Sequence, residues 1–248
     1  GLIVTDLNLV QYINIKMLNN KRILAIVPAR GGSKGIKLKN LRKVMGKSLV
    51  AIVGKLLLKI KIIDQSVIST DHSKIAKEAI KSGLKFYFFR PKKISGDKVS
   101  DTAVLLQALK ATEKVEKKKY DIVVMLHPTS PLRRSKDVIG AIKLLFKKKF
   151  DSVWTVSKTD SKYHPLKQLI IKKNKLNYYS PKGKSIIARQ QLNDVYHRNG
   201  VAYVINANFL RKKKKIIGSN SGFYIIKDKQ ISIDSLDDLA IANKFYEK

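Results

Sequence analysis

The most constraining feature of this chain is a regular alternation of short apolar runs with longer amphipathic segments. Apolar runs of strand length occur at Ile23–Val27, Val67–Ser69, Phe86–Phe89, Ile122–Leu126 and Ser152–Val156. Segments with helical periodicity separate them, at Leu49–Ile60, Lys74–Lys81, Thr102–Val115 and Lys136–Phe146. Strands that alternate with helices of this length are joined by right-handed crossovers. The pattern therefore predicts an α/β fold with a mostly parallel central sheet flanked by helices.

The pattern changes between Tyr163 and Gln190. Two short apolar runs there, Leu169–Ile171 and Leu176–Tyr179, are split by a basic turn and predict a two-stranded hairpin. Strands are predicted again at Val201–Ile205 and Phe223–Ile226, and a closing helix over Ser235–Tyr246. We interpret residues 17–248 as a single domain with an insertion at about 163–190. Residues 1–16 are expected to be a non-native or disordered extension that precedes a natural start at Met17.

Composition limits the class of protein. The 248 residues are 44% hydrophobic, enough for a core, and no apolar run is long enough to span a membrane. The absence of cysteine excludes thiolate catalysis and Cys-based zinc sites, and it fits the reducing cytoplasm, where we expect the protein to act. The net charge of +34 raises the possibility of nucleic-acid binding. Because the lysines are dispersed and the aromatics Phe86–Phe89 form a single block, we favour compositional bias and expect no nucleic-acid partner.

A glycine-rich basic loop, Val27–Asn40, follows the first predicted strand. Glycines expose backbone N–H groups to a ligand, and Arg30, Lys34, Lys37 and Lys39 surround them with positive charge. The spacing matches neither the P-loop nor the dinucleotide-binding motif. The loop is thus either a polyphosphate site or a solvated basic turn. Because further polar clusters follow other predicted strands, at the edge where α/β sheets bind ligands, we favour the polyphosphate site.

The sequence resembles the acylneuraminate cytidylyltransferases, a family that includes enzymes for legionaminic and pseudaminic acids. The resemblance covers about residues 21–246. Its motifs, in chain order, are the glycine-rich loop, Ser69-Thr70-Asp71, Phe89-Arg90-Pro91, Leu126–Arg133, Arg189-Gln190, Asn199-Gly200 with Tyr203, and Ile233–Asp238. It implies a Rossmann-like nucleotidyltransferase fold and a homodimer in which the hairpin insertion lies over the partner's site.

The resemblance also implies roles for individual residues. Arg30, Lys34 and Asp234 are the predicted catalytic residues. The predicted nucleotide-binding residues are Ala29, Arg30, Gly31, Gly32, Ser33, Lys39, Asn40, Arg90 and Asp97. The predicted sugar-binding residues are His127, Thr129, Ser130, Arg189, Gln190, Asn199 and Tyr203. Arg189 supplies the fork-shaped cation that suits a substrate carboxylate, whereas Arg133 is expected to be structural.

Three positions depart from the family pattern. A proline usually stands near Lys37, a glutamine usually stands at His127, and an aspartate usually stands at Ser232. His127 can act as a hydrogen-bonding residue or as a general base, and we favour the former. Asp234 is the predicted Mg²⁺ ligand, with Asp237 and Asp238 assigned to the start of the last helix. Without a carboxylate at position 232, we expect weaker magnesium binding than in the family.

The activity that this resemblance implies is transfer of CMP from CTP to a nine-carbon 2-keto sugar acid. The anomeric hydroxyl attacks the α-phosphate in line and pyrophosphate leaves, so cations, amides and Mg²⁺ are the parts required. Two alternatives stay open. One is another nucleotidyltransferase, for example one acting on 3-deoxy-octulosonate. The other is a basic nucleic-acid-binding protein on the same fold.

Overall fold

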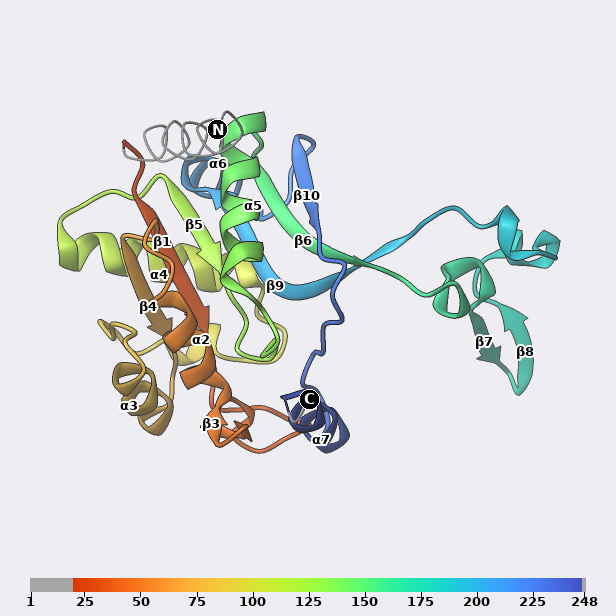
Figure 1. Ribbon diagram of the computed structural model, residues 1–248, viewed down its shortest axis with the longest axis horizontal. Coiled ribbons are helices and arrows are strands. Elements are labelled where there is room, and N and C mark those ends of the chain that lie inside the picture. Colours follow the sequence, from red (N-terminus) through yellow and green to blue (C-terminus); the bar gives the residue numbers. More distant parts are fainter. Residues whose placement is uncertain (1–19, 247–248) are drawn as a thin grey trace, which may run out of the picture.

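The structure is a computed structural model that describes residues 20–246, so the expected extension at 1–16 lies outside the described residues. Its centre is a six-stranded sheet (Figure 1). In spatial order the strands are β10 (Ser221–Ile225), β6 (Ser152–Lys158), β9 (Tyr196–Asn206), β5 (Ile122–Met125), β1 (Ile23–Pro28) and β4 (Gln65–Ser69). Strand β9 runs antiparallel to both neighbours, and the other paired strands run parallel. The predicted mostly parallel sheet is confirmed.

Helices cover both faces of the sheet, which explains why its central strands are apolar without interruption. On β1, Ile23, Ala25 and Val27 share one buried cluster with α2, α3 and α5. The alternate residues, Leu24 and Ile26, pack on the other face with α4 and α6. The helices are α2 (Leu49–Leu57), α3 (Ser73–Lys81), α4 (Asp101–Glu116), α5 (Ser135–Lys148), α6 (Ala207–Lys213) and α7 (Leu236–Tyr246).

The predicted strand at Phe86–Phe89 was wrong. This segment lies beside β4 but forms only two isolated parallel bridges with it, Val67 to Lys85 and Thr70 to Phe89. Between these two bridges the chain advances by three residues on the β4 side and by four residues on the side of the aromatic segment. The extra residue interrupts the hydrogen-bond ladder, as it does in a β-bulge. The segment still covers the edge of the sheet, and it delivers Arg90, whose N–H donates to the Thr70 carbonyl at 2.7 Å.

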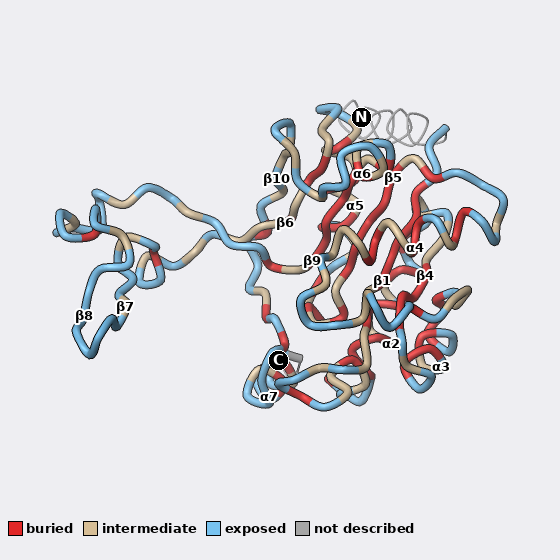
Figure 2. The backbone as a smooth tube through the Cα atoms, turned by 180° about the vertical axis from the view of Figure 1, so that it is seen from behind, coloured by how far each residue is buried: buried red, intermediate tan, exposed pale blue. Residues whose placement is uncertain are grey.

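An arm projects from the body of the molecule on a two-stranded stem (Figure 1). The chain leaves along β6 and returns along β9, with Val156 paired to Arg198 and Lys158 paired to Tyr196. At the tip, β7 (Leu169–Lys172) and β8 (Lys175–Tyr178) form the predicted hairpin, and four short 3₁₀ turns complete the arm. Figure 2 shows that most of the arm is exposed, whereas the central strands of the sheet are buried. A second small hairpin, β2 (Lys43–Val44) with β3 (Lys47–Ser48), follows the glycine-rich loop.

A third apolar cluster holds α7 against the segment that follows the glycine-rich loop. It joins Ile36, Val44 and Leu49 to Ile233 and Leu239. The C-terminal helix is thereby fixed beside the loop, although some 200 residues separate them in the sequence.

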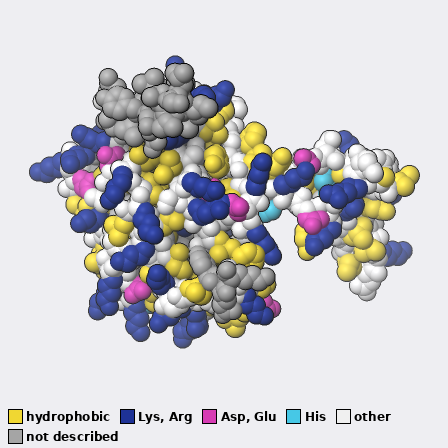
Figure 3. Space-filling view, in the orientation of Figure 1, with side chains coloured by type: hydrophobic (Ala, Val, Ile, Leu, Met, Phe, Trp, Pro, Cys, Tyr) yellow, Lys and Arg dark blue, Asp and Glu magenta, His cyan; other side chains and the backbone are white. Residues whose placement is uncertain are grey.

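Charge and hydropathy also bear on possible partners. Lys and Arg side chains are spread over the visible face of the body in Figure 3 and do not gather into one patch. Among the described residues, no helix has the length and apolar character needed to cross a bilayer.

Candidate active site

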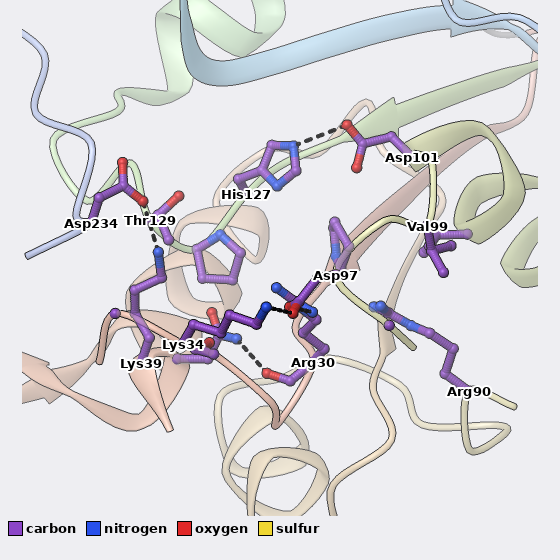
Figure 4. A pocket seen from close by; sticks show the side chains of 17 residues that line it. Arg30, Lys34, Lys39, Arg90, Asp97, Val99, Asp101, His127, Thr129 and Asp234 are labelled. Atoms are coloured by element: carbon purple, nitrogen blue, oxygen red, sulfur yellow. Dashed lines mark hydrogen bonds and ion pairs between the residues drawn. The ribbon is translucent and has the colours of Figure 1, made fainter. Parts of the chain in front are cut away.

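The carboxyl ends of the parallel strands β1, β4 and β5 meet at one edge of the sheet, as expected for a ligand site in this architecture. A pocket of about 530 Å³ opens there (Figure 4). Its lining includes ten of the residues predicted from the sequence: Arg30, Ser33, Lys34, Lys39, Asn40, Arg90, Asp97, His127, Thr129 and Asp234. Segments from Pro28 to Asp234 thus converge on a single cavity.

The glycine-rich loop is held in place by its neighbours. The Gly31 N–H donates to Asp71 Oδ1 at 2.8 Å, and Asn40 Nδ2 donates to the Arg30 carbonyl at 3.0 Å. A Cβ on Gly31 would come within 2.8 Å of the His72 ring, and one on Gly35 within 2.9 Å of the Asp234 carbonyl oxygen. Glycine is required at both positions because the backbone approaches other groups closely.

Carboxylates pair with three cations of the pocket. Asp97 forms ion pairs with Arg30 and with Lys34, the latter at 2.7 Å between Nζ and Oδ2. Hydrogen bonds from Lys34 and Arg30 hold the pKa of Asp97 below its usual value. Lys39 Nζ lies 2.8 Å from Asp234 Oδ1. These contacts keep the cations at the pocket wall, where they can bind an anion.

Arg90 is buried at the end of the segment beside β4. Its Nε donates to Ser69 Oγ at 3.0 Å and its Nη2 to the Ser69 carbonyl at 2.5 Å. Burial lowers the pKa of Arg90 to about 10, so the guanidinium stays charged at neutral pH. The strand end therefore fixes both the position and the direction of this cation.

His127 lies two residues after the end of β5 and faces the first turn of α4. Its Nε2 lies 3.8 Å from Asp101 Oδ2, and its ring meets Tyr203 edge-on with centroids 5.8 Å apart. Burial lowers the pKa of His127 below its usual value, although the Asp101 carboxylate opposes this shift. His127 is therefore mainly neutral at pH 7.

Asp234 lies beside Thr129 on the pocket wall, just before α7, and the N–H of the preceding Ile233 donates to the Thr129 carbonyl at 2.8 Å (Figure 4). Its Oδ2 accepts a hydrogen bond from Ser232 Oγ at 3.1 Å. Asp238 is instead used locally, because its Oδ2 accepts from the backbone N–H groups of Asp234 and Ser235 at 2.9 and 2.8 Å. Within residues 20–246, no three His, Cys, Asp or Glu side chains are grouped so that they alone would hold a metal ion.

Comparison of the sequence with known protein families identifies the family to which the chain belongs. Residues 24–248 match the family model described as cytidylyltransferase. The chain belongs to the cytidylyltransferase family.

Two relatives and one solved structure illustrate the match. The chain is 30% identical over 207 residues to post-translational flagellin modification protein B of Campylobacter coli, covering 83% of this chain and 86% of the relative. It is 29% identical over 225 residues to a pseudaminic acid cytidylyltransferase of Campylobacter jejuni, covering 90% and 96% respectively. The fold matches that of a CMP:2-keto-3-deoxy-manno-octonic acid synthetase complexed with CTP, with a TM-score of 0.69 at 15% identity over 91% of this chain and 98% of that one.

In this cytidylyltransferase, several predicted site residues are buried beside the pocket and do not line it. Ser130 Oγ donates to the Asn199 carbonyl at 3.0 Å, and the Asn199 side chain bonds Thr155 and Ser157. Tyr203 packs edge-on against Trp154. The remaining loop positions, Ala29, Gly31 and Gly32, are also absent from the pocket lining. Arg133 donates to the Val201 and Gly200 carbonyls at 2.8 and 3.0 Å, which fits its expected structural role.

The structure does not bring Arg189 and Gln190 to the pocket of their own chain. Both lie in the 3₁₀ turn Arg189–Gln191 of the arm. Arg189 lines a separate cavity of about 380 Å³ within the arm, together with Lys158 and His164.

Sequence reasoning left three site residues unassigned. Asp71 anchors the loop through Gly31, and its signal was present in the Ser-Thr-Asp motif. Ser69, from the same motif, holds Arg90. The sequence indicated only that Asp101 lies at the start of a helix. It did not indicate a role in the site, because the proximity of Asp101 to His127 depends on the tertiary packing of α4.

Proposed function

We propose that this protein transfers CMP from CTP to a nine-carbon 2-keto sugar acid of the sialic type and releases pyrophosphate. The observation that carries the proposal is the convergence of Arg30, Lys34, Lys39 and Arg90 on one pocket in a chain of the cytidylyltransferase family. The relative named for pseudaminic acid, matched over 90% of this chain, supports the nine-carbon class of acceptor.

The reaction places charge demands that these residues can meet. The anomeric oxygen attacks the α-phosphorus in line, and negative charge builds on the departing pyrophosphate. Arg30 grips two phosphate oxygens and Lys34 acts as a point charge on the same chain of phosphates. Because Asp97 already holds both side chains at the pocket wall, little reorganisation is needed when the phosphates bind.

The donor set fits a magnesium ion that is held mainly by the nucleotide. Mg²⁺ prefers one or two carboxylates together with phosphate oxygens and water, and the exposed Asp234 carboxylate offers one such ligand at the pocket wall. When bound, the ion would neutralise charge on the phosphate oxygens. Lys39 supplies charge at the same place, since it pairs with Asp234.

We propose further that two copies of the chain form a homodimer through the arm. Leu169, Ile171 and Leu176 on the hairpin are 48%, 76% and 68% exposed, which is unusual for apolar side chains on a thin projection. In such a dimer Arg189 and Gln190 would serve the sugar carboxylate of the partner's site. The use of CTP leads us to assign the reaction to the cytoplasm.

Pyrophosphate release tests the function directly. Each of the four nucleoside triphosphates is supplied with Mg²⁺ and with a panel of acidic sugars that includes pseudaminic, legionaminic, N-acetylneuraminic and 3-deoxy-octulosonic acids. We expect release only with CTP and a nine-carbon acid. Turnover confined to the eight-carbon acid would favour the alternative enzyme. Tight, salt-sensitive RNA binding without turnover would favour the nucleic-acid-binding protein.

A further inference from the structure

His127 and Asp101 form a pair on the wall of the pocket that the function proposed above does not use. His127 follows β5, and Asp101 is the first residue of α4. Both line the cavity that holds Arg30 and Asp234 (Figure 4). Their Nε2 and Oδ2 atoms lie 3.8 Å apart, so a movement of less than about 1 Å would bring the neutral imidazole into a hydrogen bond with the carboxylate.

The Asp101 carboxylate selects the tautomer of the imidazole. A carboxylate beside Nε2 favours the form that carries its proton there, which leaves the lone pair on Nδ1. In Figure 4 the second ring nitrogen lies on the side of the ring away from Asp101. The Tyr203 ring, edge-on at 5.8 Å, limits rotation of the imidazole. The ring is thus oriented by one residue and packed by another.

We propose that His127, oriented by Asp101, accepts the proton of the sugar's anomeric hydroxyl as its oxygen attacks the α-phosphorus. The new oxygen–phosphorus bond forms while the bond from the α-phosphorus to the oxygen bridging to the β-phosphate breaks. Pyrophosphate keeps that electron pair, and the proton moves to Nδ1 and later to solvent. The Asp101 carboxylate stabilises the imidazolium in between. This inference rests on the proposed cytidylyl transfer.

The charges that face His127 suit a base that works near neutral pH. Asp101 on α4 raises the pKa of His127, whereas burial, Arg133, Arg198 on β9 and Lys39 lower it, with burial the largest effect. Burial also keeps Tyr203 neutral by raising its pKa. The imidazole is therefore unprotonated over most of the range in which the enzyme would act, and free to take a proton.

Single-turnover rates measured between pH 5 and 9 test the pair. The wild-type rate should fall at acid pH as His127 becomes protonated. His127→Gln introduces the residue usual in the family, which forms hydrogen bonds but cannot take a proton. If this chain uses the His127–Asp101 pair as its base, the rate of the variant should fall by about a hundredfold or more and lose this dependence. Any dependence from the CTP phosphates, which titrate near pH 6, would persist in the variant and is thereby separated. His197→Gln, an exposed histidine outside the pocket, is the matched control and should behave as wild type.

Asp101→Asn tests the positioning residue. Because Asp101 raises the pKa of His127, its loss should shift the acid limb to lower pH and reduce the plateau rate. The Kd for CTP, measured by calorimetry, should be unchanged in both pocket variants, which shows that they are folded. A His127→Gln variant that binds CTP and keeps the wild-type rate and pH profile overturns the inference alone. A wild-type protein that binds CTP but uses no sugar overturns both this inference and the proposed function.

Discussion

Arg30, Lys34 and Lys39 each already have an anion within the chain, since Asp97 pairs with the first two and Asp234 with the third. A bound triphosphate would therefore share these cations with the carboxylates or take the place of the carboxylates, because none of the three cations is unpaired beforehand. Such pairing keeps the side chains ordered at a modest cost, because one charged partner is exchanged for another.

Arg30→Ala tests this loop at the level of one side chain. Turnover should fall by at least about tenfold, which corresponds to about 1.4 kcal/mol of transition-state stabilisation, because the guanidinium fork is lost. Steady-state pyrophosphate release measures the effect. Arg22→Ala removes an exposed arginine outside the pocket and should leave the rate unchanged. A folded Arg30→Ala protein with the full rate would falsify the assignment of the phosphate loop.

Ser232→Asp tests the missing carboxylate. Ser232 Oγ lies 3.1 Å from Asp234 Oδ2, so an aspartate at 232 would add a second carboxylate at the same point of the wall. The Mg²⁺ concentration for half-maximal rate should fall, since magnesium accepts one or two carboxylates. Ser232→Asn, similar in size but neutral, should not lower it. The idea fails if the aspartate and asparagine variants need equal magnesium.

At the scale of elements, α7 shows how a local signal places a site residue. Asp238 accepts from the Ser235 N–H at 2.8 Å, and Ser235 Oγ accepts from the Asp238 N–H at 3.2 Å, which is a capping box with aspartate in the third position. The box fixes the start of the helix and, through it, the backbone of Asp234. Asp234 thus points into the pocket because its neighbour caps a helix.

Asp238→Ala should lower the free energy of unfolding by about 1 kcal/mol at pH 7, the usual cost of losing a cap. The hydrogen bond from the Asp234 N–H is the main cause that holds the pKa of Asp238 below its usual value. Its folded pKa is thus below the unfolded one, so the stabilisation is present above about pH 4 and is lost as the pH falls through the folded pKa. Urea unfolding at several pH values should show the difference from wild type shrinking in acid. Asp237→Ala, an exposed acid in the same turn, should show a smaller effect; equal losses in both variants contradict the cap.

The elements also show what the sequence could and could not predict. Long apolar runs such as Ile23–Val27 and Ile122–Leu126 marked their strands because burial on both faces leaves no polar alternation. The aromatic block Phe86–Phe89 was wrongly predicted as a strand, because apolar residues also occur where an extended segment covers the edge of a sheet without regular pairing. The extra residue that interrupts the pairing cannot be recognised in the local sequence. Helix α6 was missed since only Ala207 and Leu210 of its seven residues are buried and it ends among lysines. The contact of His127 with Asp101 depends on packing between distant segments.

At the scale of the whole molecule, the arm is the feature that one chain cannot explain. Its hairpin exposes apolar side chains on a thin projection, and Arg189 lies away from the pocket. Association of two copies would bury the apolar side chains of the hairpin and would bring Arg189 to a substrate in the partner's pocket. A symmetric pair of arms is the simplest arrangement, because identical chains associate most often through two-fold interfaces.

Ile171→Lys tests that arrangement. Placing a charge where the hairpin would be buried should raise the dimer dissociation constant at least about tenfold, equivalent to about 1.4 kcal/mol. Analytical ultracentrifugation over a concentration series measures it. Ile80→Lys is the matched control, because Ile80 is also exposed, at 53%, but lies on α3 in the body. If the wild-type chain sediments as a monomer at all concentrations, the arm has another purpose.

The stem of the arm has an evolutionary consequence. Because the chain departs on β6 and comes back on the antiparallel β9, the two ends of the excursion are already neighbours at Lys158 and Tyr196. Segments of very different length and shape can be inserted between such adjacent points without disturbing the register of the sheet. If the arm serves assembly and acceptor binding as proposed above, both properties can diversify by exchange of this segment, while the pocket on the body keeps its nucleotide-binding residues.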